Sequence, residues 1–498
     1  MPGYAPEPGG EGFAQSRACF AELEEWLSGV EAGGLTHAEL EGQLGERGRE
    51  LLRRLHQDHL DLRAAREQRR EAVTGSDGIA RTRVEGGHRR GLVTVFGQVT
   101  VTRMAYRTPR AANLHPADAD LNLPEEKHSH GLRKLAAIES ARGSFASAAQ
   151  AVTRATGIVV GKRQVEDLAQ RTAADIGAFY ARRRPGPAPD DRLLVLTFDG
   201  KGIVMRPEAL REATARAAAA TRRKLATRLS PGEKHGRKRM AELAAVYDAA
   251  PAPRAPADII RLPGHDGHPR RPGPAAAGKW LTASVTEDIA TVIAAGFDEA
   301  GRRDPGHRRT WVALVDGNKA QIEAIEAEAA RRHVSVHIVC DLIHVLEYLW
   351  KAVWSFFCPG DPDAEDWVAA QAVKVLEGKA AVVAAGIRRR ATTFGYSPAE
   401  REGADECAGY LTAKRLWLDY PTALARGWPI ATGVIEGACR WLVKDRMDIT
   451  GARWGLDGAE AILKLRALIA SGDFDEYWPF HLRQEHQRVH RSRYSLAA

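Results

Sequence analysis

Hydrophobic positions recur with different periods along this 498-residue chain, and each period predicts a different kind of element. Between about residues 13 and 70 the period is helical. The pattern Thr36-x-x-Glu39 is that of a capping box, so a helix is expected to begin there. Alternation about Gly97, within residues 92–103, instead predicts a β-hairpin. We therefore expect a mainly helical region with a hairpin over residues 13–128, after a Gly/Pro-rich, disordered segment at 1–12.

The leucines of the helix after Thr36 lie on one face, and their charged neighbours lie elsewhere. Such a face is either ordinary packing or a dimerising surface. The sequence alone leaves both open, and the leucines in question are Leu40, Leu44, Leu51, Leu55 and Leu62.

Residues 129–181 return to helical spacing and break at Thr156-Gly157. A small-residue helix, a glycine turn and a second helix with polar residues at its start follow the helix-turn-helix order. The first residues of the second helix are those that would face base edges, namely Lys162, Arg163 and Gln164. We predict a DNA-binding region here, with two simply packed helices as the alternative.

A new domain is expected from residue 192 to 475, after the Pro-rich linker 182–191 and before a C-terminal tail at 476–498. Its apolar runs predict strand, strand, strand, helix, strand, helix, strand, helix. That is the order of an RNase H-like mixed sheet, which makes the fold class mixed α/β. Residues 342–430 are almost all helical in pattern and are expected to be an all-α insertion.

Three acidic residues mark the ends of elements in this domain. Asp199 follows the apolar run 193–198, Asp316 follows 311–315, and Glu436 lies in a helix entered through a glycine turn. Carboxylates of this kind suit two Mg²⁺ (or Mn²⁺) ions, which take a few carboxylate oxygens and leave room for water and phosphate. Two such ions can stabilise both oxygens of an in-line phosphoryl displacement. Any one of these acids alone is more often a cap or a solvated residue.

Charge favours a polyanionic partner. The chain has 72 Lys and Arg against 64 Asp and Glu, a net charge of +8, and twelve of the basic residues lie between residues 201 and 240. Because this run follows Asp199 directly, we expect phosphate contacts from it, with a solvated loop as the alternative. Its members include Arg222, Arg223, Lys224, Lys234, Arg237, Lys238 and Arg239.

Five scattered cysteines without a C-x-x-C pair argue against a zinc ribbon or a disulfide framework and fit a reducing compartment. No stretch has the apolar length of a signal peptide or a membrane span. We expect a cytoplasmic, nucleoid-associated protein with no membrane partner.

Several phrases of the sequence resemble one known family. They are DGKGIVMRPEAL, GEKHGRKRMAELAAVYD, WVALVDGNKAQ, CDLIHVLEYLW, GWPIATGVIEGACRWLVKDRMDITGARWGL and AEAILKLRALIASGDFDEYW. In this order they resemble the ISKra-four family of bacterial DDE insertion-sequence transposases, over essentially the whole chain after residue 90. The resemblance implies magnesium-dependent cleavage and strand transfer at an RNase H-like site, acting on the element's terminal inverted repeats. It also implies a homo-oligomer on DNA, with catalytic, metal-binding acids at Asp199, Asp316 and Glu436.

The segment Cys340-Asp341-Leu342-Ile343-His344 resembles the C/D-x-x-H motif of Mutator-like transposases. It makes Asp341 and His344 auxiliary candidates. His344 would touch a phosphate or orient a base, or it would be a core histidine bonded to Asp341.

Arg440 and Lys444 stand at i+4 and i+8 from Glu436, so helical spacing puts them on its face. We expect them to hold the attacked strand, with Arg446 and Arg453 extending the basic surface. A helix that is merely solvated through its cations is the alternative.

Two other functions remain open at the level of sequence. One is an RNase H-fold nuclease that cuts without joining, which a strand-transfer product would exclude. The other is a domesticated or inactive copy that serves as a DNA-binding regulator. Imperfect inverted repeats bounded by short direct repeats in the flanking DNA would argue against it.

Overall fold

The computed structural model describes residues 11–186, 189–220, 225, 233, 236–262, 269–449 and 451–494. The chain forms two units, one of residues 1–181 with 474–498 and one of residues 182–473. The expected disordered segment 1–12 lies almost wholly outside the described residues.

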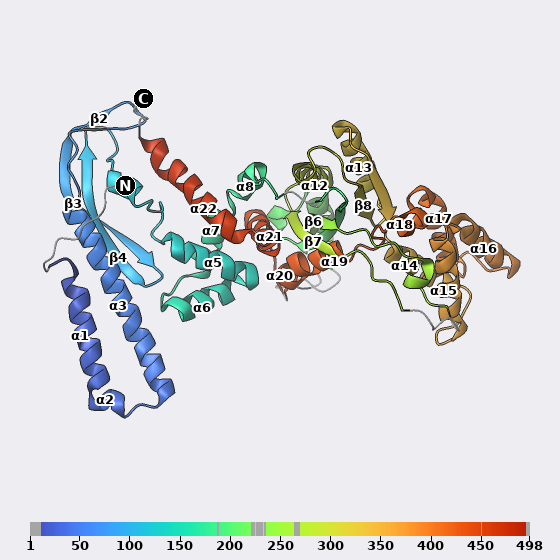
Figure 1. Cartoon of the computed structure of the whole chain (residues 1–498), viewed down its shortest axis with the longest axis horizontal. Helices are drawn as coiled ribbons and strands as arrows, with labels where there is room; N and C mark the ends of the chain where they lie inside the picture. Colours follow the sequence, from blue (N-terminus) through green and yellow to red (C-terminus); the bar gives the residue numbers. More distant parts are fainter. Residues whose placement is uncertain are drawn as a thin grey trace. The chain divides into compact units, whose positions relative to one another are not determined.

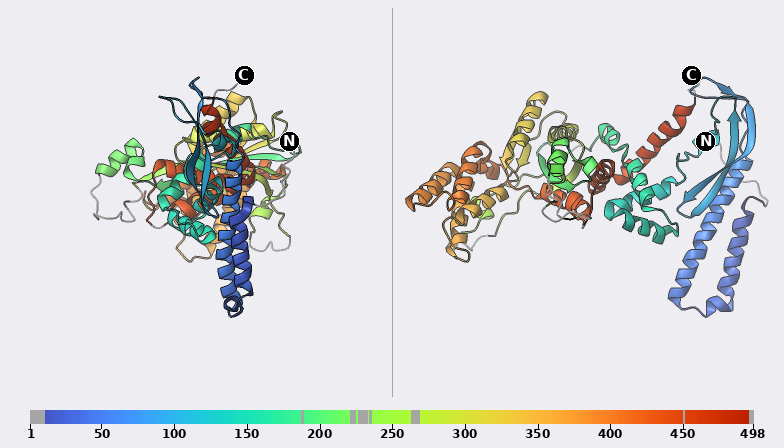
Figure 2. Two further views of the ribbon diagram at one scale, coloured as in Figure 1. Left: turned by 90° about the vertical axis from the view of Figure 1, so that its left-hand side faces the viewer. Right: turned by 180° about the vertical axis from the view of Figure 1, so that it is seen from behind.

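The first unit opens with a helical hairpin in which α1 and α3 lie side by side (Figure 1, Figure 2). The Thr36 hydroxyl accepts the Glu39 N–H, and the Glu39 carboxylate accepts the Thr36 N–H at 2.9 Å, which confirms the capping box. The hairpin's helices are α1 (Ala14–Ser28), α2 (Val30–Gly33) and α3 (His37–Ala65), after a short 3₁₀ turn at Glu11–Phe13.

The predicted β-hairpin is confirmed and is longer than expected. Strands β3 (Arg83–Thr94) and β4 (Gly97–Arg107) pair antiparallel through a two-residue loop, and Gly97 has a φ of 135°. Leu92, Val99 and Val101 of this hairpin share a small core with Leu60 of α3 and Leu123. Two short strands, β1 (Val73–Thr74) and β2 (Ala80–Arg81), precede it, and α4 (Pro116–Asp120) follows.

Three helices form the core of the predicted helix-turn-helix region. The turn after α6 is made by Gly157 at a φ of 71°, a left-handed conformation that favours glycine. Apolar residues of all three helices pack in one cluster. The helices are α5 (His130–Arg142), α6 (Phe145–Thr156) and α7 (Lys162–Ala173), and α8 (Ile176–Arg182) follows.

Residues expected to form a C-terminal tail are instead an integral part of the first unit. Helix α22 (Phe474–Glu485) and the short helices at His486–His490 and Arg491–Arg493 belong to it. Arg133 of α5, fully buried, donates to Glu485 at 2.6 Å, and His481 lies 2.7 Å from Asp175. Charged partners far apart in sequence therefore attach this helix to α5 and α7–α8.

The second unit is built on a five-stranded mixed sheet with the order β7-β6-β5-β8-β9. β5 pairs antiparallel with β6, and β6 with β7, whereas β5, β8 and β9 run parallel. The strands are β5 (Leu193–Val204), β6 (Lys238–Ala249), β7 (Ala276–Ser284), β8 (Trp311–Val315) and β9 (Val336–Cys340), in the predicted order. The coarse prediction of a mixed α/β fold is confirmed.

Continuous apolar runs form the central strands because both faces of the sheet are covered. Phe198 points to α12 (Ile289–Arg303), where a β-carbon at Gly296 would lie 2.9 Å from its ring. Asp199, the next residue, points to the opposite face. There it meets the segment that follows α19 (Gly433–Ala438). The other helices close to the sheet are α13 (Lys319–Arg332) and α21 (Leu456–Ala470).

Helices follow β9 over the predicted insertion. The longer ones are α14 (Leu342–Val353), α15 (Asp363–Leu376), α16 (Ala380–Thr393) and α17 (Glu402–Ala413), and α18 (Tyr420–Ala425) is shorter (Figure 1). Two further short helices of this unit are α9 (Glu212–Ala220) and α11 (Pro256–Ile259).

Candidate active site

Three aspartates lie just past the last paired residues of the parallel strands. The β5–β8 register ends with Thr197 opposite Leu314, and Asp199 and Asp316 each come two residues later. The β8–β9 register ends with Val315 opposite Cys340, and Asp316 and Asp341 each come one residue later. Adjacent strands lie about 4.8 Å apart. The sheet thus brings three aspartates that are up to 142 residues apart in sequence, from 199 to 341, to the same end of neighbouring strands.

The sequence pattern suggested that Asp199 ends its strand, but the strand continues past it. β5 continues to Val204 and stays paired with β6, while its pairing with β8 stops at Thr197. At Asp199, β5 is therefore still paired with β6 but no longer with β8. This leaves one side of the strand open at Asp199.

Helix α19 is tied to these strands through the Thr432 hydroxyl. This buried side chain donates to the Asp341 carboxylate, and it also lies 3.2 Å from Oε1 of Glu436. A hydroxyl has one proton, so it serves one of these acceptors at a time. The backbone adds a bond from Leu342 N–H to the Ile430 carbonyl at 2.9 Å. Glu436 is held near the strand ends by these contacts.

A second tie joins the Glu436 helix to Asp199. The Cys439 thiol, three residues after Glu436, donates to Oδ2 of Asp199 at 3.1 Å. Burial, with the Asp199 charge and its hydrogen bond, raises the pKa of this thiol. It therefore stays protonated at neutral pH and remains a donor. The sequence analysis treated Cys439 only as one of five scattered cysteines, although its i+3 spacing from Glu436 was a usable signal.

Exposure separates the four acids into two groups. Asp341 is fully buried and caps α14 by accepting the Ile343 N–H at 2.9 Å. Asp199 and Asp316 are half-buried, and Glu436 is exposed. The three acids predicted to be catalytic are thus accessible to a ligand, whereas Asp341 is occupied with positioning.

The insertion helices contact the loop after β8. Tyr410 of α17 donates to the Asp316 carbonyl at 3.1 Å and stacks on Tyr348 of α14, with ring centroids 4.1 Å apart. Gly317 has a φ of 95°, and a β-carbon there would lie 3.0 Å from the Tyr410 oxygen. Only glycine fits this turn without strain. The insertion therefore helps to fix the backbone that carries Asp316.

Glu242 is an additional carboxylate that the sequence analysis did not identify. It lies on β6 opposite Gly200, and a β-carbon at Gly200 would lie 2.9 Å from its Oε2. Burial raises its pKa, although the Arg211 charge opposes this, and the Asp199 and Asp288 charges add to the rise. Alternation along β6 gives no sign of it, because its relation to Asp199 depends on the pairing with β5.

His344 is not bonded to Asp341, so the core-histidine alternative is wrong. The side chain is about one-third exposed, and its Nδ1 lies 3.1 Å from the Glu347 carboxylate one turn later. Asp341 is instead bonded to Ile343 and Thr432. No contact in the structure distinguishes the phosphate role from the base role.

Residues 237–239 were predicted to contact phosphate. Two of these three side chains instead donate hydrogen bonds to backbone carbonyls of the second unit. Arg237 is buried and donates to the Ala218 carbonyl at 3.4 Å. Arg239 donates to the Val285 carbonyl at 2.7 Å and to the Ala209 carbonyl at 3.3 Å. Lys238 is half-buried along Gly202. The charge run was expected to contact phosphate, with a solvated loop as the alternative, whereas β6 begins within it at Lys238. The remaining members Arg222, Arg223, Lys224 and Lys234 lie outside the described residues.

Arg440 and Lys444 are both exposed, but they do not follow α-helical spacing from Glu436. The segment Cys439–Lys444 is a π-helix, which widens the turn and shifts every later side chain. The prediction of a shared face at i+4 and i+8 is therefore wrong in its geometry. Arg446, expected on the surface, is buried with its guanidinium 4.7 Å from the Trp454 ring centroid.

The predicted reading residues begin α7 of the first unit. Lys162 and Arg163 are exposed, whereas the Gln164 side chain accepts the Gly161 N–H at 3.1 Å and caps the helix. Gln164 is thus partly committed to the fold. The other two side chains are accessible to a ligand.

The donors at the strand ends have the chemistry that Mg²⁺ takes, namely carboxylate oxygens with no soft ligand required. Each is held by a hydrogen bond of its own, as in the 2.7 Å bond from Asn318 N–H to Asp316. Within the described residues, no group of three His, Cys, Asp or Glu is close enough to hold a metal ion. The ligand types fit the ion, and binding would require the carboxylates to come closer together.

Among the described residues, no helix is both long and apolar enough to cross a bilayer. A comparison of the chain with models of known protein families finds no match, and a comparison with curated proteins finds none either.

Proposed function

We propose that this protein is a DNA transposase that cleaves the ends of an insertion sequence and joins them to target DNA. The observation that carries the proposal is that Asp199 and Asp316 each lie two residues past the last β5–β8 pair, while Thr432 and Cys439 bond the Glu436 segment to Asp341 and Asp199. The order of strands and helices, β5-β6-β7-α12-β8-α13-β9-α14, supports an RNase H-like fold for this unit.

Asp199, Asp316 and Glu436 would hold two Mg²⁺ (or Mn²⁺) ions. Bound there, such ions lower the pKa of water and stabilise both the entering and the leaving oxygen of a phosphodiester. The chain's own residues position these ligands. Thr432 and Asp341 orient the Glu436 helix, Cys439 orients Asp199, and Tyr410 fixes the backbone at Asp316.

The remaining chemistry requires little covalent participation from the protein. In the first step water attacks the phosphodiester at the element's end and a 3′-hydroxyl leaves. In the second step that hydroxyl attacks a phosphodiester of target DNA, so a new phosphodiester forms and a 3′-hydroxyl of the target strand leaves. Positioning and charge neutralisation account for catalysis in phosphoryl transfer of this kind.

We further propose that α6 and α7 bind the terminal inverted repeats, with Lys162 and Arg163 toward the base edges. Their exposure and the packed three-helix core support this role. Binding two ends at once requires a homo-oligomer on DNA, and a cytoplasmic, nucleoid-associated location follows from the same function. Arg440, Lys444 and Lys238 are the cations of the second unit that we propose near the attacked strand.

Asp316→Asn tests the proposal. With labelled element ends, a target plasmid and Mg²⁺, we expect cleavage to fall by about a thousandfold or more, because the metal supplies several kcal/mol of transition-state stabilisation. Binding to the ends should stay near wild type. Asp366→Asn, an exposed aspartate in the first turn of α15, is the matched control and should cleave normally.

The products separate the remaining functions. Joined products support a transposase. Nicked ends without joining indicate a nuclease, and specific binding without either indicates a DNA-binding regulator. Wild-type cleavage by Asp316→Asn would remove Asp316 from the active site.

A further inference from the structure

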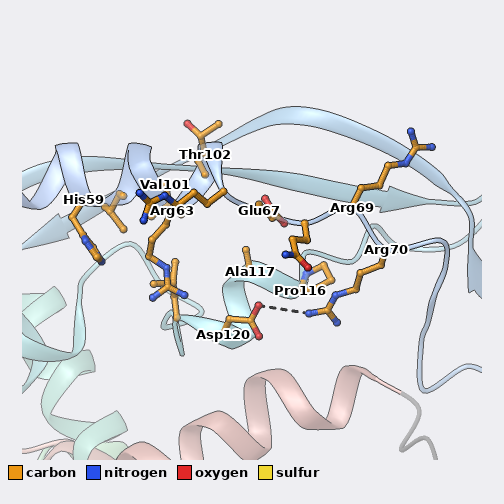
Figure 3. Close-up of a pocket in the computed structure, with 15 residues that line it drawn as sticks. His59, Arg63, Glu67, Arg69, Arg70, Val101, Thr102, Pro116, Ala117 and Asp120 are labelled. Atoms are coloured by element: carbon orange, nitrogen blue, oxygen red, sulfur yellow. Dashed lines mark ion pairs between the residues drawn. The ribbon is translucent and has the colours of Figure 1, made fainter. Parts of the chain in front are cut away.

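The first unit has a cavity of about 490 Å³ at the carboxyl end of α3 (Figure 3). Its walls come from the last turns of α3, the segment 66–70 that follows, strand β4, and α4 with Leu121. Leu60, Val101 and Pro116 give it an apolar lining. Cavities of this size accept small organic ligands.

Basic side chains dominate the polar part of this lining. Four arginines and one histidine line the cavity, against two carboxylates. If the histidine is neutral, these six charged groups give a local charge of +2, from four positive and two negative side chains. The basic residues are His59, Arg63, Arg66, Arg69 and Arg70.

Both carboxylates already have partners within the fold. Glu67 accepts the Met104 N–H at 2.8 Å, and Asp120 pairs with Arg70 at 3.6 Å, the contact drawn as a dashed line in Figure 3. Arg63 and Arg69 are exposed, and among the described residues neither has a carboxylate partner. Both guanidinium groups are therefore open to a ligand of opposite charge, but they lie on different sides of the lining, and the Arg69 side chain extends outward from it (Figure 3).

The segment that carries these arginines is held in place. The Arg70 N–H donates to the hydroxyl of Tyr106 at 2.7 Å, and Tyr106 is almost fully buried. The Glu67 bond to β4 anchors the same segment a second time. Such anchoring reduces the entropy that ligand binding would cost.

We propose that this cavity binds a phosphate ester, with Arg63 contacting the oxygens of one phosphate group and Arg69 those of another. Guanidinium forks match the geometry of phosphate and remain charged at every physiological pH. The apolar wall suits the sugar attached to such a phosphate. The ester comes either from a DNA backbone or from a free nucleotide, and the DNA source rests on the proposed function. A backbone contact here would add affinity without sequence preference, unlike the contacts proposed for α7.

The test uses the full chain and the double variant Arg63→Ala/Arg69→Ala. In the first arm, binding to duplex DNA of scrambled sequence is measured by fluorescence anisotropy at several salt concentrations. Loss of two phosphate contacts should lower the salt slope by about two units. In the second arm, binding of ATP and of inorganic pyrophosphate is measured by calorimetry, and the double variant should lose it.

Two variants control for general charge and for folding. Arg331→Ala removes one exposed arginine from the last turn of α13 in the second unit and should leave both arms unchanged. Arg63→Lys/Arg69→Lys keeps the charge and should restore most of the salt slope, while its affinity for pyrophosphate stays below that of wild type. This result would separate fork recognition from bulk electrostatics.

A change in the DNA arm assigns the phosphate to a nucleic-acid backbone, and a change in the nucleotide arm alone assigns it to a free nucleotide. If both arms stay at wild-type values in a folded double variant, the proposal is overturned. Failure of the proposed function is distinguishable from this, because it would appear as absent cleavage and joining while the phosphate arms still respond to Arg63 and Arg69.

Discussion

The two units differ in whether their clustered carboxylates have cationic partners. Around Arg133 every carboxylate has a cation: Asp175 is bonded to His481 and Arg488, and Glu485 to Arg133 and Arg488. At the strand ends of the second unit, among the described residues, none of the four acids forms an ion pair with lysine or arginine. In the first unit the charge of each of these carboxylates is balanced by a cationic side chain. In the second unit the four described carboxylates lack such a side chain, and a bound cation would balance their negative charge.

The pKa shifts follow the same contrast. Burial alone would raise the pKa of Asp175, but the hydrogen bonds from His481 and Arg488 outweigh it and lower the pKa to about 2. In the second unit burial raises the pKa of Cys439 and of Glu242, and the Asp199 charge adds to both. Paired carboxylates indicate a structural role, and unpaired ones at a sheet edge indicate a binding site.

The largest loss of stability is expected when the ion-pair network around Arg133 is broken. Arg133→Ala leaves Glu126 and Glu485 without their buried cation, so the free energy of unfolding should fall by about 3–5 kcal/mol. Denaturant titration measures this. Arg142→Ala removes an arginine that is 72% exposed and should cost under about 1 kcal/mol. Equal losses in the two variants would contradict the contrast.

The incomplete site should be stabilised by a divalent cation. At a Mg²⁺ concentration about 100 times its dissociation constant, the native state should gain about 2.7 kcal/mol, because only that state presents the carboxylates together. Unfolding is measured with Mg²⁺ and with EDTA. Asp199→Asn should lose most of this gain, and Asp175→Asn should keep it. A wild-type protein indifferent to Mg²⁺ would count against the metal assignment.

The Asp175 network should also make stability depend on acid pH. The pKa of Asp175 is about 2 in the folded protein and 3.8 in the reference state. Its contribution of about 2 kcal/mol is therefore present above pH 3.8 and is lost as the pH falls toward 2. The difference in unfolding free energy between wild type and Asp175→Asn should shrink over that window. A difference that stays constant from pH 5 to pH 2 would exclude this account.

The smallest effect concerns the alignment of Glu436. Thr432→Val keeps the shape of the side chain and removes the hydroxyl, so half-maximal cleavage should require about tenfold more Mg²⁺. Thr432→Ser should restore the wild-type requirement. A purely structural role would lower the melting temperature without moving the Mg²⁺ dependence, and that outcome would remove Thr432 from the positioning network.

Local signals were enough for the strands, the capping box and the hairpin, because each is coded within about a dozen residues. They also indicated Asp316 as a strand-end acid and Glu436 as a helix acid, whereas Asp199, expected at a strand end, lies within β5. Cys439 and Glu242 were missed because their relation to Asp199 exists only after strands and helices pair. The run at 237–239 was misread because charge does not reveal burial, and a π-helix at Cys439–Lys444 has no pattern in α-helical spacing.

The return of α22 to the first unit has a consequence for synthesis. A ribosome makes residues 1–181 first, then the whole of the second unit, and only afterwards the helix that supplies His481 and Glu485. Until that helix emerges, Arg133 and Asp175 lack these two partners. The second unit, which lies in sequence between the two segments of the first unit, can fold during this interval. A fragment of the first unit that stops near residue 184 would omit the closing helix, so a complete fragment must carry residues 474–494 joined by a linker. The first unit is therefore complete only after α22, near the end of the chain, has been synthesised.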